Sequence, residues 1–154
     1  MLENTSGQKD FGILLLLAYA KFKRELHQTL HGQGFNDLGT SFGFVFRVLE
    51  DSPLNLRGLA DRLGISPQGA LKIVDEMVVK KYVLRVPDPN DGRATILKLA
   101  PRGERAFGAA RRFHHEFERS LATTIGEKYV SNTRLALTEL IGDSNETMAS
   151  VRLL

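Results

Sequence analysis

The stretch from Leu56 to Asp75 restricts the fold of this chain more than any other segment. A small residue, Ala60, stands where two steeply crossing helices would touch, and Gly64 stands where a tight turn needs positive φ. Ser66 can cap the second helix, and Pro67 can begin it because proline already has a helical φ. All these positions fit one register, so the stretch predicts a helix-turn-helix. Its shared core is expected to contain Leu59, Leu63, Ile73, Val74 and Met77.

A β-hairpin is expected directly after these two helices, which we place at Leu56–Leu63 and Pro67–Lys80. Tyr82–Val86 and Thr95–Leu99 are rich in the β-branched and aromatic residues that favour strands. Between them, Pro87–Gly92 contains only residues typical of turns. Together the segments predict a winged helix-turn-helix.

Longer helices are expected on both sides of this winged unit. Apolar residues at three- and four-residue spacing predict one from Phe11 to Leu30, ended by Gly32 and Gly34. Another runs to about Asp51 and can be capped by Ser41. Pro101 begins a long helix to about Thr124, and a last helix covers about Lys128–Ile141. The fold class is therefore mainly α with a small β-wing.

The first and last helices are expected to dimerise, because their apolar faces need a partner and a two-fold dimer is the commonest solution. We expect a single domain over residues 1–154, with dimerisation helices at 11–50 and 101–154 around a winged helix-turn-helix lobe at 53–99. The seam would contain Tyr129, Val130, Leu135, Leu137, Leu140, Ile141 and residues of Val151–Leu154.

Composition narrows the functional classes. The chain has 154 residues and no cysteine, which excludes disulfides and thiolate metal sites. No apolar run approaches the ~20 residues of a membrane span, and Met1–Lys9 has no apolar targeting core, so we expect a cytoplasmic protein without a membrane partner. No phosphate loop, nucleophile motif or cofactor fingerprint is present, so we expect neither an enzyme nor a cofactor.

Charge is unevenly distributed along the chain. The net charge is +3, but twelve basic and six acidic residues lie between Asn55 and Arg112. A basic middle segment suits a polyanion such as duplex DNA, although most basic faces are simply solvated.

The second helix of the motif would leave Gln68, Gly69, Leu71, Lys72 and Asp75 toward solvent. Glutamine can pair with adenine through two hydrogen bonds, and lysine can donate to guanine. The missing side chain of Gly69 would allow close approach of a base or phosphate, or the residue is an ordinary surface glycine.

The predicted wing carries Arg85 and Arg93. An arginine at the hairpin tip can enter the minor groove, and Asp91 could orient the Arg93 guanidinium. The alternative is that Asn90–Gly92 is only a good turn. The candidate DNA-contacting residues are Ser66, Pro67, Gln68, Gly69, Leu71, Lys72, Arg85, Asp91 and Arg93.

From Phe11 to Leu140 the sequence resembles the MarR family of transcriptional regulators. The resemblance is carried by Leu59–Ser66, Ile73–Met77, Val83–Arg85 leading into Asp88–Arg93, and Leu99–Gly103. Asp91–Arg93 matches the family's wing signature, whereas Leu71 and Lys72 replace the family's frequent threonine and arginine, and Ala100 replaces its usual threonine cap.

The resemblance implies a triangular homodimer with interlocked terminal helices and a ligand cavity between the dimer interface and the DNA-binding lobes. The expected function is a repressor of a pseudo-palindromic operator, relieved by a small aromatic or other apolar ligand. The alternatives are an activator or metal-responsive regulator of the same fold, and a winged-helix module for protein assembly.

A phenylalanine-rich set could line the ligand pocket, although most of these rings must be core. The candidate pocket residues are Tyr19, Phe22, Phe42, Phe46, Arg47, Arg112 and Phe113, with His114 as a further group able to grip an anion. His27 and His31 have a chelating spacing, and His114, His115 and Glu118 could add ligands, but the set is loose and we expect no metal.

Overall fold

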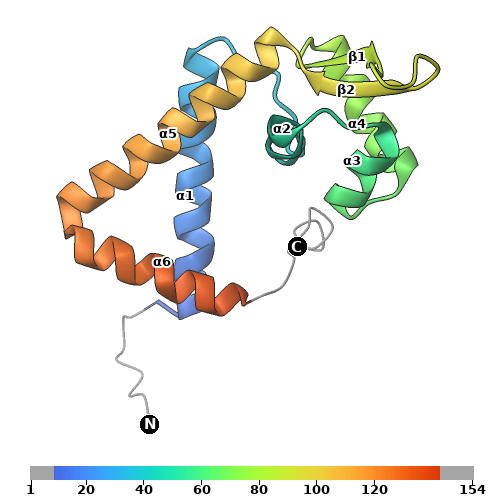
Figure 1. Cartoon of the computed structure of the whole chain (residues 1–154). Coiled ribbons are helices and arrows are strands. Elements are labelled where there is room, and N and C mark those ends of the chain that lie inside the picture. The colour runs from blue at the N-terminus through green and yellow to red at the C-terminus, as the bar shows by residue number, and fades with distance from the viewer. Residues whose placement is uncertain (1–8, 143–154) are drawn as a thin grey trace. The chain divides into compact units, whose positions relative to one another are not determined.

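A computed structural model describes residues 9–142 in two parts, which divide between Asn36 and Asp37 and are described separately (Figure 1). The first part contains one helix, α1 (Phe11–Gly32). The helix runs two residues beyond the predicted end at Leu30, and its C-cap is Gln33. Gly34 follows with φ +87°, so it is Gly34 rather than Gly32 that reverses the chain.

The second part contains the remaining helices and a hairpin, in the predicted order. Its elements are α2 (Phe42–Asp51), α3 (Leu56–Leu63), α4 (Pro67–Val79), β1 (Val83–Pro87), β2 (Thr95–Leu99), α5 (Pro101–Ile125) and α6 (Glu127–Ile141). The predicted first strand begins one residue too early. The Tyr82 N–H donates to the Met77 carbonyl at 2.7 Å, so Tyr82 still closes the end of α4.

Local capping explains the boundaries of α3. The Asn55 side chain accepts a hydrogen bond from the Gly58 N–H at 2.7 Å, which satisfies one of the free donors of the first turn. Gly64 ends the helix with φ +66°, as the turn requires.

The predicted side-chain cap of α2 is wrong: Ser41 stands at the N-cap, but its side chain makes no capping hydrogen bond. Its backbone is already helical, at φ −91° and ψ −10°, whereas a capping side chain needs an extended backbone.

The hairpin is antiparallel, with Val83 opposite Leu99 at its base and Pro87 opposite Thr95 near its tip. Leu54 adds an isolated bridge to Leu97, and each residue donates its N–H to the other's carbonyl. The sequence did not indicate this third short pairing, which ties the segment between α2 and α3 to the wing.

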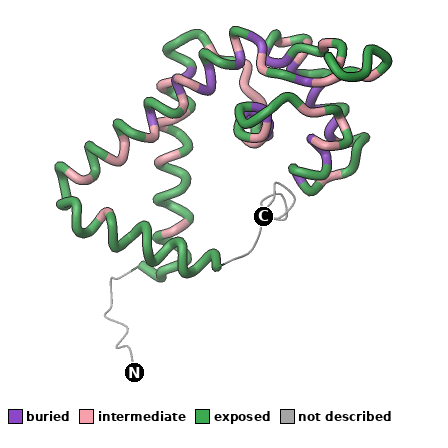
Figure 2. Tube along the Cα trace, viewed as in Figure 1, coloured by how far each residue is buried: buried purple, intermediate pink, exposed green. Residues whose placement is uncertain are grey.

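The core of the second part lies within α2, α3, α4, the hairpin and the first half of α5 (Figure 2). All five residues predicted for the helix-turn-helix core are at most 7% exposed, and Ala60 is fully buried. Their burial confirms the predicted register.

The second half of α5 and all of α6 contain no buried residue in the described chain (Figure 2). Exposed apolar residues of α6 include Tyr129, Leu135, Leu140 and Ile141, while the seam residues expected within Val151–Leu154 lie outside the described range. Among residues 9–142, no helix is both long and apolar enough to cross a bilayer.

Candidate nucleic-acid interface

Helix α4, the candidate reading helix for DNA, begins at a well-formed N-cap. Ser66 has an extended backbone, and its hydroxyl oxygen accepts a hydrogen bond from the Gly69 N–H at 3.1 Å. Pro67 occupies the first turn, where its missing N–H costs nothing. The cap predicted from the sequence is therefore confirmed, and it fixes the end of α4 that carries the candidate base contacts.

The outer face of α4 is exposed and mostly polar. Gln68, Leu71, Lys72 and Asp75 are exposed, as expected. A Cβ built on Gly69 would lie 3.2 Å from the Ser66 hydroxyl oxygen. A side chain at Gly69 would therefore crowd the capping serine by a few tenths of an ångström.

Tight turns close the wing tip between the two strands. The Asp88 N–H donates to the Ala94 carbonyl, and the Ala94 N–H donates to the Asp91 carbonyl, both at 2.9 Å. The Asp91 carboxylate accepts from the main-chain N–H of Arg93 at 3.0 Å. The prediction that Asp91 orients the Arg93 guanidinium is therefore wrong, because its short side chain reaches the backbone two residues ahead first. Within residues 9–142 the guanidinium of Arg93 makes no ion pair.

Arg85 does not lie at the tip. It stands opposite Leu97 in the middle of β1, and its guanidinium donates to the Asp75 carboxylate of α4 at 2.5 Å. The pair joins the wing to the reading helix and neutralises the charge of Arg85. A contact between Arg85 and DNA stays a prediction.

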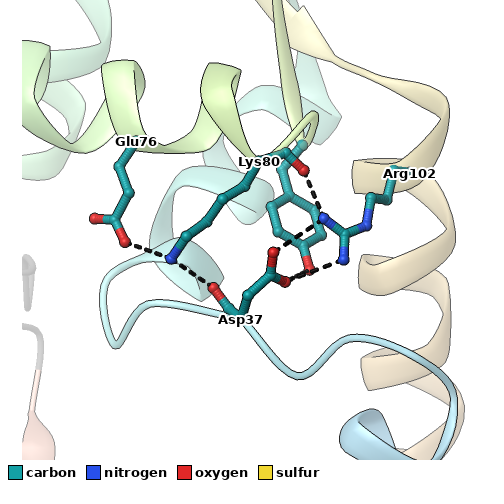
Figure 3. A network of polar contacts seen from close by, with 5 residues as sticks. Asp37, Glu76, Lys80 and Arg102 are labelled. Atoms are coloured by element: carbon teal, nitrogen blue, oxygen red, sulfur yellow. Dashed lines mark hydrogen bonds and ion pairs between the residues drawn. The ribbon is translucent and has the colours of Figure 1, made fainter.

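A polar cluster that the sequence did not indicate lies at the other end of α4 (Figure 3). Asp37 accepts the Tyr82 hydroxyl at 2.5 Å and two guanidinium N–H groups of Arg102 at 3.1 Å each. Arg102 also donates to the Lys80 carbonyl at 2.6 Å, and the Lys80 ammonium donates to the Asp37 carbonyl at 2.7 Å and to Glu76 at 2.6 Å. We name Asp37, Lys80, Tyr82 and Arg102 the Asp37 cluster. Its members are up to 65 residues apart, so no local pattern could have found it.

Protonation in the Asp37 cluster is well defined. Burial alone would raise the pKa of Asp37, but the hydrogen bonds from Tyr82 and Arg102 outweigh it and hold that pKa below 3.8. Burial, followed by the hydrogen bond to Asp37, raises the pKa of Tyr82 well above 10.0. Asp37 is therefore a carboxylate and Tyr82 a neutral donor over the whole neutral range.

Several residues assigned to a ligand pocket lie in the apolar core. Phe42 and Phe46 are 1% and 3% exposed, and each packs edge-on against Tyr82, with ring centroids 5.6 and 5.8 Å apart. Phe113 is also buried and contacts Phe117. Burial, followed by the charge of Arg47, lowers the pKa of His114 below 6.5, and Arg112 is exposed on α5. Tyr19 and Phe22 lie in α1, in the first part of the chain.

Two open grooves lie within the second part. One, of about 560 Å³, has an apolar floor of Leu49, Leu84, Leu99 and Phe107 beside the ion pair of Glu50 with Arg111. The other, of about 820 Å³, lies between α5 and α6 and includes Arg112. In the part of the chain that the structure describes, no three His, Asp or Glu side chains are grouped closely enough to hold a metal ion.

Comparisons with known proteins agree with this geometry. The model of the MarR family matches residues 44–94. The sequence has no match among curated proteins. Several solved structures share the fold. A single-residue mutant of S. aureus MepR, bound to an oligodeoxyribonucleotide, is 18% identical, with a TM-score of 0.62 over 87% of this chain and 97% of that one.

Two further structures give the same result. S. aureus MepR bound to ethidium bromide is 19% identical, with a TM-score of 0.65 over 88% of this chain and 97% of that one. The reduced form of MarR from E. coli is 19% identical, with a TM-score of 0.65 over 89% of this chain and 100% of that one. Residues 44–94 therefore match the sequence pattern of the MarR family, and the chain has the winged-helix fold of these solved structures.

Proposed function

We propose that this protein is a sequence-specific DNA-binding transcriptional regulator that acts as a homodimer and has no enzymatic activity. The observation that carries the proposal is the first half of α4, which presents Gln68 and Lys72 to solvent from a rigid, capped helix start. Glutamine and lysine are suited to base edges in the major groove. The guanidinium of Arg93 at the wing tip is suited to the narrow minor groove beside it.

The homodimer is supported by the apolar surfaces of the helices outside the winged unit. In α6, Tyr129, Leu135 and Leu140 are each more than 60% exposed. In α1, Phe11 and Leu16 are 67% and 61% exposed. Apolar side chains repeated along an exposed helix favour association. A two-fold dimer would place two reading helices about 34 Å apart, which fits a pseudo-palindromic DNA site.

Repression relieved by a small apolar ligand completes the proposal. A mutant of MepR bound to an oligodeoxyribonucleotide and MepR bound to ethidium bromide have the same fold, which supports DNA and a small aromatic molecule as ligands here. The pocket of Tyr19, Phe22, Phe42, Phe46, Arg47, Arg112 and Phe113 stays a prediction. Ethidium is the first probe to titrate against the protein, in the absence of DNA because ethidium also binds duplexes.

The experiment that tests DNA binding is selection of duplexes from a random library by the purified protein. We expect an enriched pseudo-palindrome whose affinity falls with added salt. Absence of an enriched sequence would favour a winged-helix module for protein assembly instead.

Single-residue variants then test which side chains contact DNA. Arg93→Ala should weaken binding of the selected duplex about tenfold or more while the dimer stays intact, and Lys72→Ala should lose affinity or base preference. Arg105→Ala is the matched control, because it removes the same charge from the exposed face of α5. Equal affinities of the Arg93→Ala variant and the Arg105→Ala control would contradict the wing contact.

A further inference from the structure

The Asp37 cluster fastens three separate elements at one point (Figure 3). Asp37 belongs to the segment before α2, Lys80 and Tyr82 follow α4, and Arg102 lies in the first turn of α5. The two Asp37 carboxylate oxygens receive three donors, and the main-chain carbonyl of Asp37 receives a fourth from Lys80. A carboxylate that accepts a bidentate arginine and a phenol hydroxyl has a fixed orientation.

The packing around the cluster makes it rigid. The Tyr82 side chain is fully buried, so its hydroxyl needs a partner, and Asp37 is the acceptor. The Arg102 guanidinium lies over the Tyr82 ring, 4.4 Å from its centre. The Tyr82 carbonyl accepts the Ala100 N–H at 2.9 Å, which holds the start of α5 against the end of α4.

The cluster lies at one end of α4 and the candidate base contacts lie at the other. Twelve residues separate Gln68 from Lys80, which is about 18 Å along a helix at 1.5 Å per residue. A rotation of about 10° at the anchored end would therefore move the Gln68 end by about 3 Å, a distance that would break a hydrogen bond to a base. A small rotation of α4 at the cluster therefore produces a larger displacement of its Gln68 end.

We propose that Asp37 is a positioning residue for DNA recognition, which sets the direction of α4 through Tyr82, Arg102 and Lys80 without touching DNA. The inference rests on the proposed DNA-binding function. Asp37 lies in the segment that precedes α2, so the cluster also ties this segment to the end of α4.

The test compares Asp37→Asn with Asp51→Asn on the duplex that the wild-type protein selects. Both changes remove one negative charge, and Asp51 is an exposed residue whose ion pair with Arg62 lies at the surface. Loss of negative charge by itself strengthens binding to DNA. We expect Asp37→Asn to weaken binding of the selected duplex about tenfold, whereas Asp51→Asn should bind as well as wild type or better.

A second measurement separates positioning from loss of structure. Asp37→Asn should bind a duplex of unrelated sequence as well as wild type or better, because all phosphate-facing cations remain. An unfolded lobe would bind neither the selected nor the unrelated duplex, and that result would overturn the inference. Tyr82→Phe, which removes only the hydroxyl, should give a smaller loss on the selected duplex and none on the unrelated one.

The outcomes distinguish this inference from the proposed function. If wild type selects a duplex and Asp37→Asn binds it with wild-type affinity, Asp37 has no positioning role and the proposed function stands. If wild type selects no duplex, the proposed function fails and the inference fails with it.

Discussion

Replacement of Gly103 by alanine should destabilise the protein, although alanine favours helices. A Cβ on Gly103 would lie 2.1 Å from the Tyr82 carbonyl oxygen and 3.1 Å from its carbon. An ordinary carbon–oxygen contact is about 3.3 Å, so the start of α5 must move by about 1 Å. Because the obstacle is main chain, rotation of a side chain cannot relieve it, and the hydrogen bond from Ala100 to Tyr82 is stretched.

The expected change in the free energy of unfolding combines two unfavourable contributions and one favourable contribution. Overpacking costs about 1–3 kcal/mol, and loss of the Ala100 hydrogen bond adds about 1 kcal/mol. The helix propensity of alanine returns about 1 kcal/mol. We expect a net loss of about 1–3 kcal/mol in the free energy of unfolding, or about 2–12 °C in Tm for a chain of this length.

Urea and thermal unfolding followed by circular dichroism, at one protomer concentration, would measure this change. Gly108→Ala is the matched control in the same helix, since the nearest atom to its Cβ is the end of the Arg112 side chain at 3.5 Å. Gly108→Ala should be as stable as wild type or up to about 1 kcal/mol more stable. Wild-type stability of Gly103→Ala would refute the close approach of α5 to Tyr82.

Three further changes test other parts of the winged unit. Ser66→Ala should lower the free energy of unfolding by about 1 kcal/mol in urea titrations, because the Gly69 N–H loses its capping acceptor. Ser66→Asn should retain most of the wild-type stability, and equal stability of the two variants would contradict the cap. Lys81→Gly should raise the urea midpoint by the equivalent of about 0.5–1 kcal/mol, because Lys81 follows the C-cap of α4 at φ +62°, where a side chain is strained. A lower midpoint would mean that the lysine side chain makes a contact that outweighs the strain. The free energy of unfolding should fall above pH 10, because burial and Asp37 raise the pKa of Tyr82 in the folded state, so the unfolded state loses the phenol proton first. This contribution of Tyr82 to stability is fully present below pH 10, and Tyr82→Phe should remove the decline at alkaline pH.

The sequence predicted features whose partners lie within a few residues of one another. The Ser66 cap, the left-handed Gly64 and a turn at the wing tip are all short-range, and the structure has each of them. The turn lies one residue later than predicted, since its hydrogen bond joins Ala94 to Asp91. The apolar spacing of α4 was sufficient to identify its buried face, because helix geometry alone decides which residues share a side.

The errors in the sequence-based predictions arise where a polar side chain has more than one partner within reach. The sequence could not show whether the Asp91 carboxylate meets the main chain or the guanidinium of Arg93, and the main chain is nearer. It also could not show that Asp75 neutralises Arg85, or that Asp37 meets Tyr82 and Arg102 from 45 and 65 residues away. Contacts of that kind depend on the assembled fold and leave no local pattern.

The same limit applies to the basic segment between Asn55 and Arg112. Five of its twelve cations are held in ion pairs with carboxylates, namely Arg62, Lys80, Arg85, Arg102 and Arg111. Counting basic residues therefore overstates the charge that this segment can offer to phosphates.

The salt dependence of operator binding measures how much of that charge is used. Each phosphate neutralised on B-DNA contributes about −0.9 to the slope of log K against log salt. If Lys72 and Arg93 of two protomers each neutralise the charge of one phosphate, the slope is about −4. If all seven cations without an ion pair within residues 9–142 do so, the slope is about −13. A steeper slope would require further cations, either from outside this segment or from ion pairs that open on DNA, with Arg85 leaving Asp75. If Arg85 leaves Asp75, Asp75→Asn should strengthen binding and leave the slope unchanged, because the complex of the variant neutralises the same number of phosphates.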